Sequence, residues 1–162
     1  MATMGHVACG LVAARVWRDR PPRLGESVLW AVLALLPDAD VMTLGTIPYG
    51  APFGHRGASH SLVAAAVGGL LAALFARGLR VPRSARFGVL AGLVLASHGI
   101  LDTMTYGGGR GVALLWPFEA TRLWAPWRPI PIAPTGTAMW SRKGFWVLAV
   151  ETAMFAPFLA LV

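Results

Sequence analysis

The sequence predicts an all-α fold, a multi-pass membrane bundle of about five helices with a long Gly/Pro/Trp-rich loop over a metal site. Apolar residues make up 56% of the 162-residue chain and charged residues only 13%, about half the share of soluble domains. Most of the basic residues lie between apolar segments, where membrane proteins carry them. The length suits a single domain, residues 1–162.

Five apolar segments can be drawn, at about residues 4–17, 24–44, 58–76, 87–104 and 144–162. A membrane-spanning helix needs about 20 residues, so the last three nearly qualify by length. The first two are short, and Pro37 interrupts the second. Short or broken helices are tolerated at membrane depth where they line a protected cavity, which is the arrangement we expect here.

Two short connections are rich in arginine and set the expected orientation. Such loops face the cytoplasm in inner membrane proteins, so we expect the N-terminus and the long segment after the fourth helix to lie outside. The C-terminus would then lie inside. The arginines are Arg15, Arg18, Arg20 and Arg23 in one connection, and Arg77, Arg80, Arg83 and Arg86 in the other.

With this orientation, all the histidines and most of the aspartates fall at similar depth. Asp38 lies about 22 Å along its helix from Arg23, and His98 about 18 Å from Arg86, at 1.5 Å per residue. We therefore expect a cluster toward the extracytoplasmic side. Its members would be His6, Asp38, Asp40, His55, His60, His98 and Asp102.

The pair His98 and Asp102 is the strongest metal-binding signal in the chain. The two residues are four apart, so they share one face of a helix. An imidazole and a carboxylate on a membrane helix are costly unless something binds them. The alternative is a neutral histidine bonded to its neighbouring carboxylate. Thr105 lies on the same face and could hold Asp102 in place.

Residues 36–40 place two carboxylates, Asp38 and Asp40, just beyond Pro37 at the end of an apolar helix. The alternative interpretation is a helix end with solvated acids. However, acids at a helix C-terminus face the unfavourable end of the dipole, so a nearby cation is expected. Carboxylate oxygens are suitable metal ligands.

Residues 54–61 open the third apolar segment, with Ser59 as a candidate N-cap. His55 is either a ligand or an exposed loop histidine, and we expect His60 one turn inside the helix. Arg56 is a candidate for binding an anionic substrate oxygen, because guanidinium forms paired bonds with phosphate. A snorkelling interfacial arginine is the alternative.

The segment 106–143 is rich in Gly, Pro, Trp and Arg, and we expect it to form a lid or rim over the polar site. Its tryptophans suit the interface between water and lipid. Three glycines before Arg110 could present N–H groups to an anion. Glu151, within the fifth apolar segment, is a further functional candidate. The single Cys9 excludes an internal disulfide and a multi-cysteine zinc site.

Together, the motifs at 36–40, 55–61 and 97–102 resemble the DUF457 or YdjM-like family of membrane-bound, predicted metal-dependent hydrolases. The stretches 109–118 and 126–130 resemble later blocks of that family. The family is thought to be distantly similar to zinc-dependent phospholipase C and P1-type nucleases. The metal ligands of those enzymes run along the sequence in the order His, Asp, His and His-x-x-x-Asp. The same order occurs here in His6, Asp38 or Asp40, His55 or His60, and His98 with Asp102.

The resemblance implies a ligand set. Asp38, one of His55 and His60, His98 and Asp102 would form one metal site. Asp102 would bridge to a second ion held with His6. No histidine follows His98, so the resemblance favours one or two ions over three.

The expected function is a metal-dependent hydrolase that cleaves a phosphoester of a lipid or amphipathic substrate. Nitrogen and carboxylate ligands suit Zn²⁺, with Mn²⁺ or Fe²⁺ as alternatives. Whichever of Asp38 and Asp40 is not a ligand would be the general base. Arg56, Arg110 and Arg128 would bind substrate and offset developing negative charge.

The rival interpretation is a non-enzymatic membrane protein whose His/Asp site is structural or transports a metal or protons. Polar residues on one side only favour the enzyme, because a transporter needs access from both faces. The sequence pI of about 11.3 raises nucleic-acid binding, which we do not expect, because the arginines follow the membrane topology. The substrate and the oligomeric state stay open.

Overall fold

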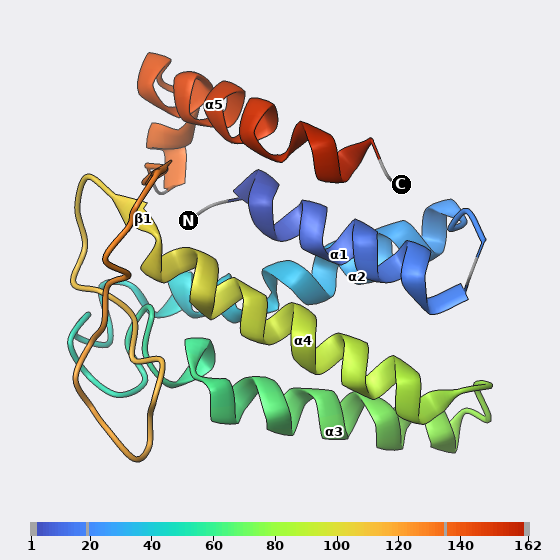
Figure 1. The fold of residues 1–162 in the computed structure, drawn as a ribbon. Coiled ribbons are helices and arrows are strands. Elements are labelled where there is room, and N and C mark those ends of the chain that lie inside the picture. The colour runs from blue at the N-terminus through green and yellow to red at the C-terminus, as the bar shows by residue number, and fades with distance from the viewer. Residues whose placement is uncertain (1–2, 19, 135, 161–162) are drawn as a thin grey trace.

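The computed structural model describes residues 3–18, 20–134 and 136–160 (Figure 1). The described residues form five α-helices: α1 (Thr3–Arg18), α2 (Leu24–Leu35), α3 (Leu62–Gly78), α4 (Ser84–Thr103) and α5 (Arg142–Leu159). Three 3-10 helices join them: η1 (Leu36–Thr43), η2 (Ala58–His60) and η3 (Gly136–Trp140). The predicted five-helix architecture is confirmed. A two-residue parallel pair, β1 (Thr105–Tyr106) with β2 (Ile130–Pro131), was not expected.

Helix α4 is the centre of the bundle. It packs against α3 on one side and against α1 and α2 on the other, while α5 lies along α1 (Figure 1). Small residues bring α3 and α4 close together, since a Cβ at Gly69 would lie 2.7 Å from the carbonyl oxygen of Gly88. Trp17, Trp30 and Phe87 form the aromatic centre of the hydrophobic core.

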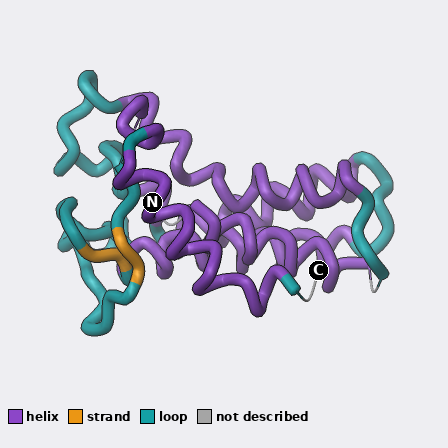
Figure 2. The backbone as a smooth tube through the Cα atoms, turned by 90° about the horizontal axis from the view of Figure 1, so that it is seen from above, coloured by secondary structure: helices purple, strands orange, loops and turns teal. Residues whose placement is uncertain are grey.

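The bundle has two different ends (Figures 1 and 2). At one end, short turns join α1 to α2 and α3 to α4, and these turns carry the arginine-rich connections. At the other end lie the long connections and the two strands. The two arginine-rich connections therefore share one end of the bundle, as the predicted topology requires.

By length and composition, α4 is the one helix within the described residues that can cross a membrane alone, and α3 is apolar but shorter. The outward faces of both helices are apolar. Leu70, Leu74, Phe75 and Val89 are all more than half exposed, and such a surface suits lipid. The multi-pass arrangement stays a prediction.

Two local predictions were wrong. Ser59 does not cap α3; Ser61 does, with its hydroxyl accepting a hydrogen bond from the backbone N–H of Ala64. His60 accordingly lies in η2, before α3, and not one turn inside it. The physical reason is that the Ser59 hydroxyl instead donates to the carboxylate of Asp40, 2.5 Å away. The predicted break at Pro37 is confirmed, because α2 ends at Leu35 and this proline lies in the first turn of η1.

Candidate metal centre

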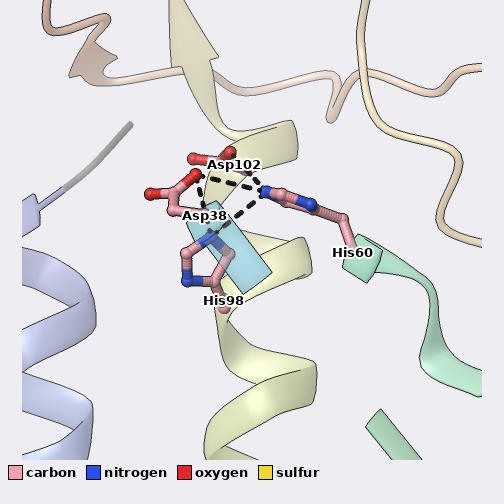
Figure 3. A group of neighbouring side chains, drawn as sticks. All are labelled: Asp38, His60, His98 and Asp102. Atoms are coloured by element: carbon pink, nitrogen blue, oxygen red, sulfur yellow. Dashed lines mark hydrogen bonds and ion pairs between the residues drawn. The ribbon is translucent and has the colours of Figure 1, made fainter. Parts of the chain in front are cut away.

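Four side chains from three elements meet at the loop end of α4 (Figure 3). Each offers one ligand atom, and these atoms all lie within 4.8 Å of one another. All four residues are buried, with Asp38 the most exposed at 8%. We call this group the four-ligand cluster; its members are Asp38, His60, His98 and Asp102.

Three features of the backbone bring these residues together: the end of α2, the close contact of η2 with α4, and the one-turn spacing of two ligands on α4. Pro37 ends α2, so that Asp38 lies in the 3-10 turn that follows. Gly99 lets η2 reach α4, because a Cβ at this position would lie 2.2 Å from the carbonyl oxygen of His60. His98 and Asp102 are one turn apart on α4, as the sequence predicts.

The two imidazoles turn their Nε2 atoms toward each other. His98 Nδ1 lies 2.7 Å from the carbonyl oxygen of Ala34, to which it donates. His60 Nδ1 lies 3.2 Å from a carboxylate oxygen of Asp40, its acceptor on that side. Without an ion, the carboxylates around His60 raise its pKa and favour a second proton on that ring. When both rings are neutral, as metal binding requires, these contacts place the proton of each ring on Nδ1 and leave two Nε2 lone pairs facing each other at 3.2 Å. A cation between them relieves their repulsion.

The carboxylates complete the coordination geometry of a small divalent ion. Asp38 Oδ1 lies 3.5 Å from Nε2 of both His60 and His98. Asp102 Oδ2 lies 3.5 Å from Nε2 of His60. Tetrahedral zinc with bonds of about 2.0–2.1 Å separates its ligand atoms by roughly 3.3–3.4 Å. Four of the six distances within the cluster, 3.2–3.5 Å, therefore lie close to those of such an ion, and the other two are no longer than 4.8 Å.

Hydrogen bonding and charge also favour a cation. Both carboxylate oxygens of Asp38 are buried and accept no hydrogen bond within the described part of the chain, which is costly without a compensating partner. Burial alone would lower the pKa of His60, but its neighbours Asp102, Asp38 and Asp40 raise it to about 10. The site therefore has an excess of negative charge.

Asp40 and His55 form a different kind of group beside the cluster, which we call the Asp40–His55 pair. His55 Nδ1 lies 2.6 Å from Asp40 Oδ1, and the other oxygen accepts from Ser59 and the backbone N–H of Arg56. Burial would raise the pKa of the Asp40 carboxyl, but hydrogen bonds from His55, His60 and Ser59 hold it well below its usual range. Asp40 therefore contacts His60 at Nδ1, the ring nitrogen that points away from the cluster, and orients the ring.

Arg56 lies fully buried against the cluster. Its Nε is 2.9 Å from Asp102 Oδ2, and its Nη1 donates to the Thr105 hydroxyl at 3.2 Å. The Nη2 atom is buried without a hydrogen-bond partner among the described residues. The backbone of Arg56 is left-handed, with φ of 60°, a conformation that costs energy in a non-glycine residue. The Thr105 hydroxyl also donates to the backbone carbonyl of Asp102, and so stabilises the last turn of α4.

His6 approaches the cluster from α1. Its ring stacks on that of His98 with centroids 3.7 Å apart, and its Nε2 lies 3.5 Å from Asp102 Oδ1. The two oxygens of Asp102 thus face different partners, Oδ2 toward His60 and Arg56 and Oδ1 toward His6. This is the position that the resemblance implies for a bridging ligand. Glu151, fully buried on α5, accepts from the backbone N–H of Met4 at 2.8 Å.

Arg110 and Arg128 form no hydrogen bond or ion pair with the cluster among the described residues, and their substrate-binding role stays a prediction. Both are exposed, and Arg128 lies over the Trp124 ring at 5.3 Å, with Arg56 at 5.8 Å from the same ring. Sequence reasoning missed Arg122, which donates to the carbonyl oxygens of His55 and Tyr49 at 2.9 and 2.7 Å. Arg122 thereby ties the long loop to the segment that holds the site. No sequence signal separates it from the other arginines of that loop.

The fold and site define a helical protein with an apolar surface and a buried His/Asp cluster that could hold a metal ion. The whole chain, residues 1–162, matches the family described as YdjM inner membrane protein, and it belongs to that family. The resemblance drawn from the motifs is thus confirmed at the level of the family.

One curated relative is Inner membrane protein YbcI of Escherichia coli (strain K12), which is 44% identical over 115 residues. The aligned region covers 70% of this chain and 65% of the relative, so the match spans just under two thirds of that protein. No solved structure matches the chain.

Proposed function

We propose that this protein is a multi-pass membrane hydrolase that cleaves a phosphoester with a divalent cation held at the four-ligand cluster. The observation that carries the proposal is the carboxylate of Asp38. It is buried, it accepts no hydrogen bond within the described part of the chain, and it lies 3.5 Å from two imidazole nitrogens that face each other. Such a set is unstable by itself and is stabilised by a cation.

The donor set favours Zn²⁺ over Mn²⁺ and Fe²⁺. Two imidazole nitrogens and two carboxylate oxygens suit zinc in tetrahedral coordination. An ion held by these four residues would need a water as a fifth ligand; it would then lower the pKa of that water to about 7 and polarise a phosphoryl oxygen. Asp38, His60, His98 and Asp102 would hold the ion.

Arg56 would bind the anionic substrate. Its Nε and Nη1 are engaged by Asp102 and Thr105, which leaves Nη2 to donate to a phosphoryl oxygen. Because both oxygens of Asp40 are already occupied, we assign Asp40 as a positioning residue for His60 and not as the general base. Arg110 and Arg128, on the exposed surface, are left to attract anionic substrates over a longer distance.

The membrane supplies the context for the substrate. We propose that the helices span the inner membrane with the arginine-rich turns in the cytoplasm. The cluster would then face the extracytoplasmic side. A phosphoester at that surface is a lipid or another amphipathic molecule.

The test is hydrolysis of bis(p-nitrophenyl) phosphate by the purified, zinc-loaded protein in detergent. We expect the wild type to release nitrophenol. Asp102→Asn, which keeps the shape of the side chain, should lower the rate at least 100-fold and reduce zinc content. Glu119→Gln, an exposed acid on the long loop, should match the wild type in both.

Two results would contradict the proposal. The first is full activity in Asp102→Asn. The second is a wild type that binds one equivalent of zinc but hydrolyses neither this probe nor phospholipid, which would favour the non-enzymatic alternative.

A further inference from the structure

An apolar groove runs between α2 and α3 and points toward the four-ligand cluster. We propose that it holds one acyl chain of a membrane phospholipid whose phosphate is the group cleaved at the cluster. The inference rests on the proposed function for the identity of the reaction. The presence of the groove and its position do not depend on that function.

The groove has a volume of about 790 Å³ and a wholly apolar lining. Helix α2 contributes Leu29 and Leu33 to one wall, α3 contributes Leu71 and Ala72 to the other, and Leu95 of α4 lies in the floor. α2 and α3 both pack on α4, which lies between them (Figure 1). A groove of this size and composition suits a hydrocarbon chain and offers nothing to a polar ligand.

The position of the groove beside the cluster indicates what occupies it. Leu36, at the site end of the groove, is two residues before Asp38, and Leu95 is three residues before His98. On α3 the lining begins at Gly68, eight residues after His60, so this wall starts farther from the cluster than the other two. Asp38 and His98 therefore lie close to the groove, on direct continuations of two of the three elements that build it. A lipid with its phosphate at the cluster would lay its chain along the groove.

The length of the groove suits one acyl chain. Along α3 the lining runs from Gly68 to Leu79, which is roughly 16 Å at 1.5 Å per residue. At the far end, Trp17 and Phe87 line the groove with their ring centroids 5.2 Å apart.

The first experiment measures lipid retention and needs no catalysis. Delipidated protein is incubated with dioleoylphosphatidylglycerol vesicles in mild detergent and re-purified, and bound phospholipid is counted by mass spectrometry. We expect about one lipid per wild-type protein, and the same for metal-depleted wild-type protein. Ala72→Phe, which fills the groove, should reduce retention at least fivefold.

Two further variants keep this test decisive if Ala72→Phe folds poorly. Leu71→Trp narrows the groove from its exposed side, since Leu71 is 59% exposed, and it should also reduce retention. Val67→Trp is the matched control, because Val67 is exposed on the same helix but does not line the groove. Folded Ala72→Phe and Leu71→Trp proteins that retain lipid like the wild type would overturn the proposal. Preference for undecaprenyl phosphate over phosphatidylglycerol would overturn the acyl-chain occupant.

The second experiment compares cleavage of phosphatidylglycerol with cleavage of bis(p-nitrophenyl) phosphate. Leu71→Trp should lose at least tenfold on the lipid and keep its rate on the soluble probe. Cleavage of the soluble probe but not of the lipid would overturn the lipid substrate while the hydrolase stands. Retention of lipid without cleavage of either compound would overturn the hydrolase, and with it the role of the bound lipid as substrate.

Discussion

The four-ligand cluster and the Asp40–His55 pair lie side by side and contain the same two residue types, yet their surroundings differ. In the pair, each oxygen of Asp40 already accepts a hydrogen bond, and His55 Nδ1 contacts it at 2.6 Å. In the cluster, Asp38 accepts no hydrogen bond among the described residues, and two Nε2 atoms face each other at 3.2 Å.

This difference distinguishes residues that bind a metal ion from residues that hold a ligand in position. A group whose polar atoms are all paired is stable as it stands, whereas a group with facing, unpaired lone pairs needs a cation. Asp40 connects the two groups, because its Oδ2 lies 3.2 Å from His60 Nδ1. Such contacts behind a ligand fix its tautomer and orientation. Ligand atoms of Asp38, Asp40 and His55 also lie within 4.8 Å of one another. From the difference in hydrogen bonding we propose metal binding for the cluster and positioning for the pair.

The largest effect is expected from His98→Ala, which removes a ligand from the cluster. Zinc content of the purified protein, measured by inductively coupled plasma mass spectrometry, should fall from about one equivalent to near zero. Ser97→Ala changes the neighbouring residue on α4, whose hydroxyl bonds only the Val94 carbonyl within the described residues, and should keep its metal. Stoichiometric zinc in His98→Ala would remove His98 from the ligand set.

The next largest effect is expected from Gly99→Ala, which pushes η2 away from α4. The added methyl group would meet the His60 carbonyl oxygen, and overpacking of this kind costs about 1–3 kcal/mol. Thermal unfolding in detergent should shift downward, and zinc affinity should fall with it. Gly25→Ala meets nothing within 4 Å and serves as the control. An unchanged unfolding temperature in Gly99→Ala would mean that this close approach is not required.

A smaller effect is expected from Asp40→Asn, which perturbs the pair but leaves all four ligands. Loss of the charge behind His60 should weaken zinc binding about 10- to 100-fold, measured by competition with a fluorescent chelator. Glu119→Gln again serves as the control. Complete loss of zinc at saturating concentration would instead make Asp40 a direct ligand.

The smallest effect is expected from His55→Ala. This variant removes one partner of Asp40 but keeps the contacts of Asp40 with Ser59 and the Arg56 backbone. Zinc stoichiometry should stay at one equivalent, with affinity reduced about tenfold or less. Loss of zinc from His55→Ala would instead indicate that His55 is a metal ligand and that His60 is not.

Helical periodicity and residue spacing made much of this arrangement predictable. The apolar segments predicted the five helices, and the four-residue spacing of His98 and Asp102 predicted their shared face. The common depth of the polar residues predicted that Asp38 and His60 would join them. These are local or one-dimensional properties of the chain, so the sequence contains them directly.

Other features depended on tertiary contacts that the sequence does not display. The choice between His55 and His60 depends on which ring faces His98, because Asp40 contacts both rings and, within the described residues, only His60 of the two contacts His98. The role of Ser59 changed from cap to carboxylate donor because η1 passes beside it. The placement of Arg122, and the exposure of Arg110 and Arg128, depend on the path of the long loop, for which no periodic pattern exists.

The most direct test of the central claim is X-ray absorption spectroscopy at the zinc edge on the purified, zinc-loaded wild type. We predict one zinc with four protein ligands and one water, all nitrogen or oxygen atoms at about 2.0–2.2 Å, two of them showing the outer scattering of imidazole. Asp40→Asn should keep this spectrum, and His98→Ala should lose it. A wild type that binds no zinc, or a spectrum in which His98→Ala changes nothing, would contradict the account.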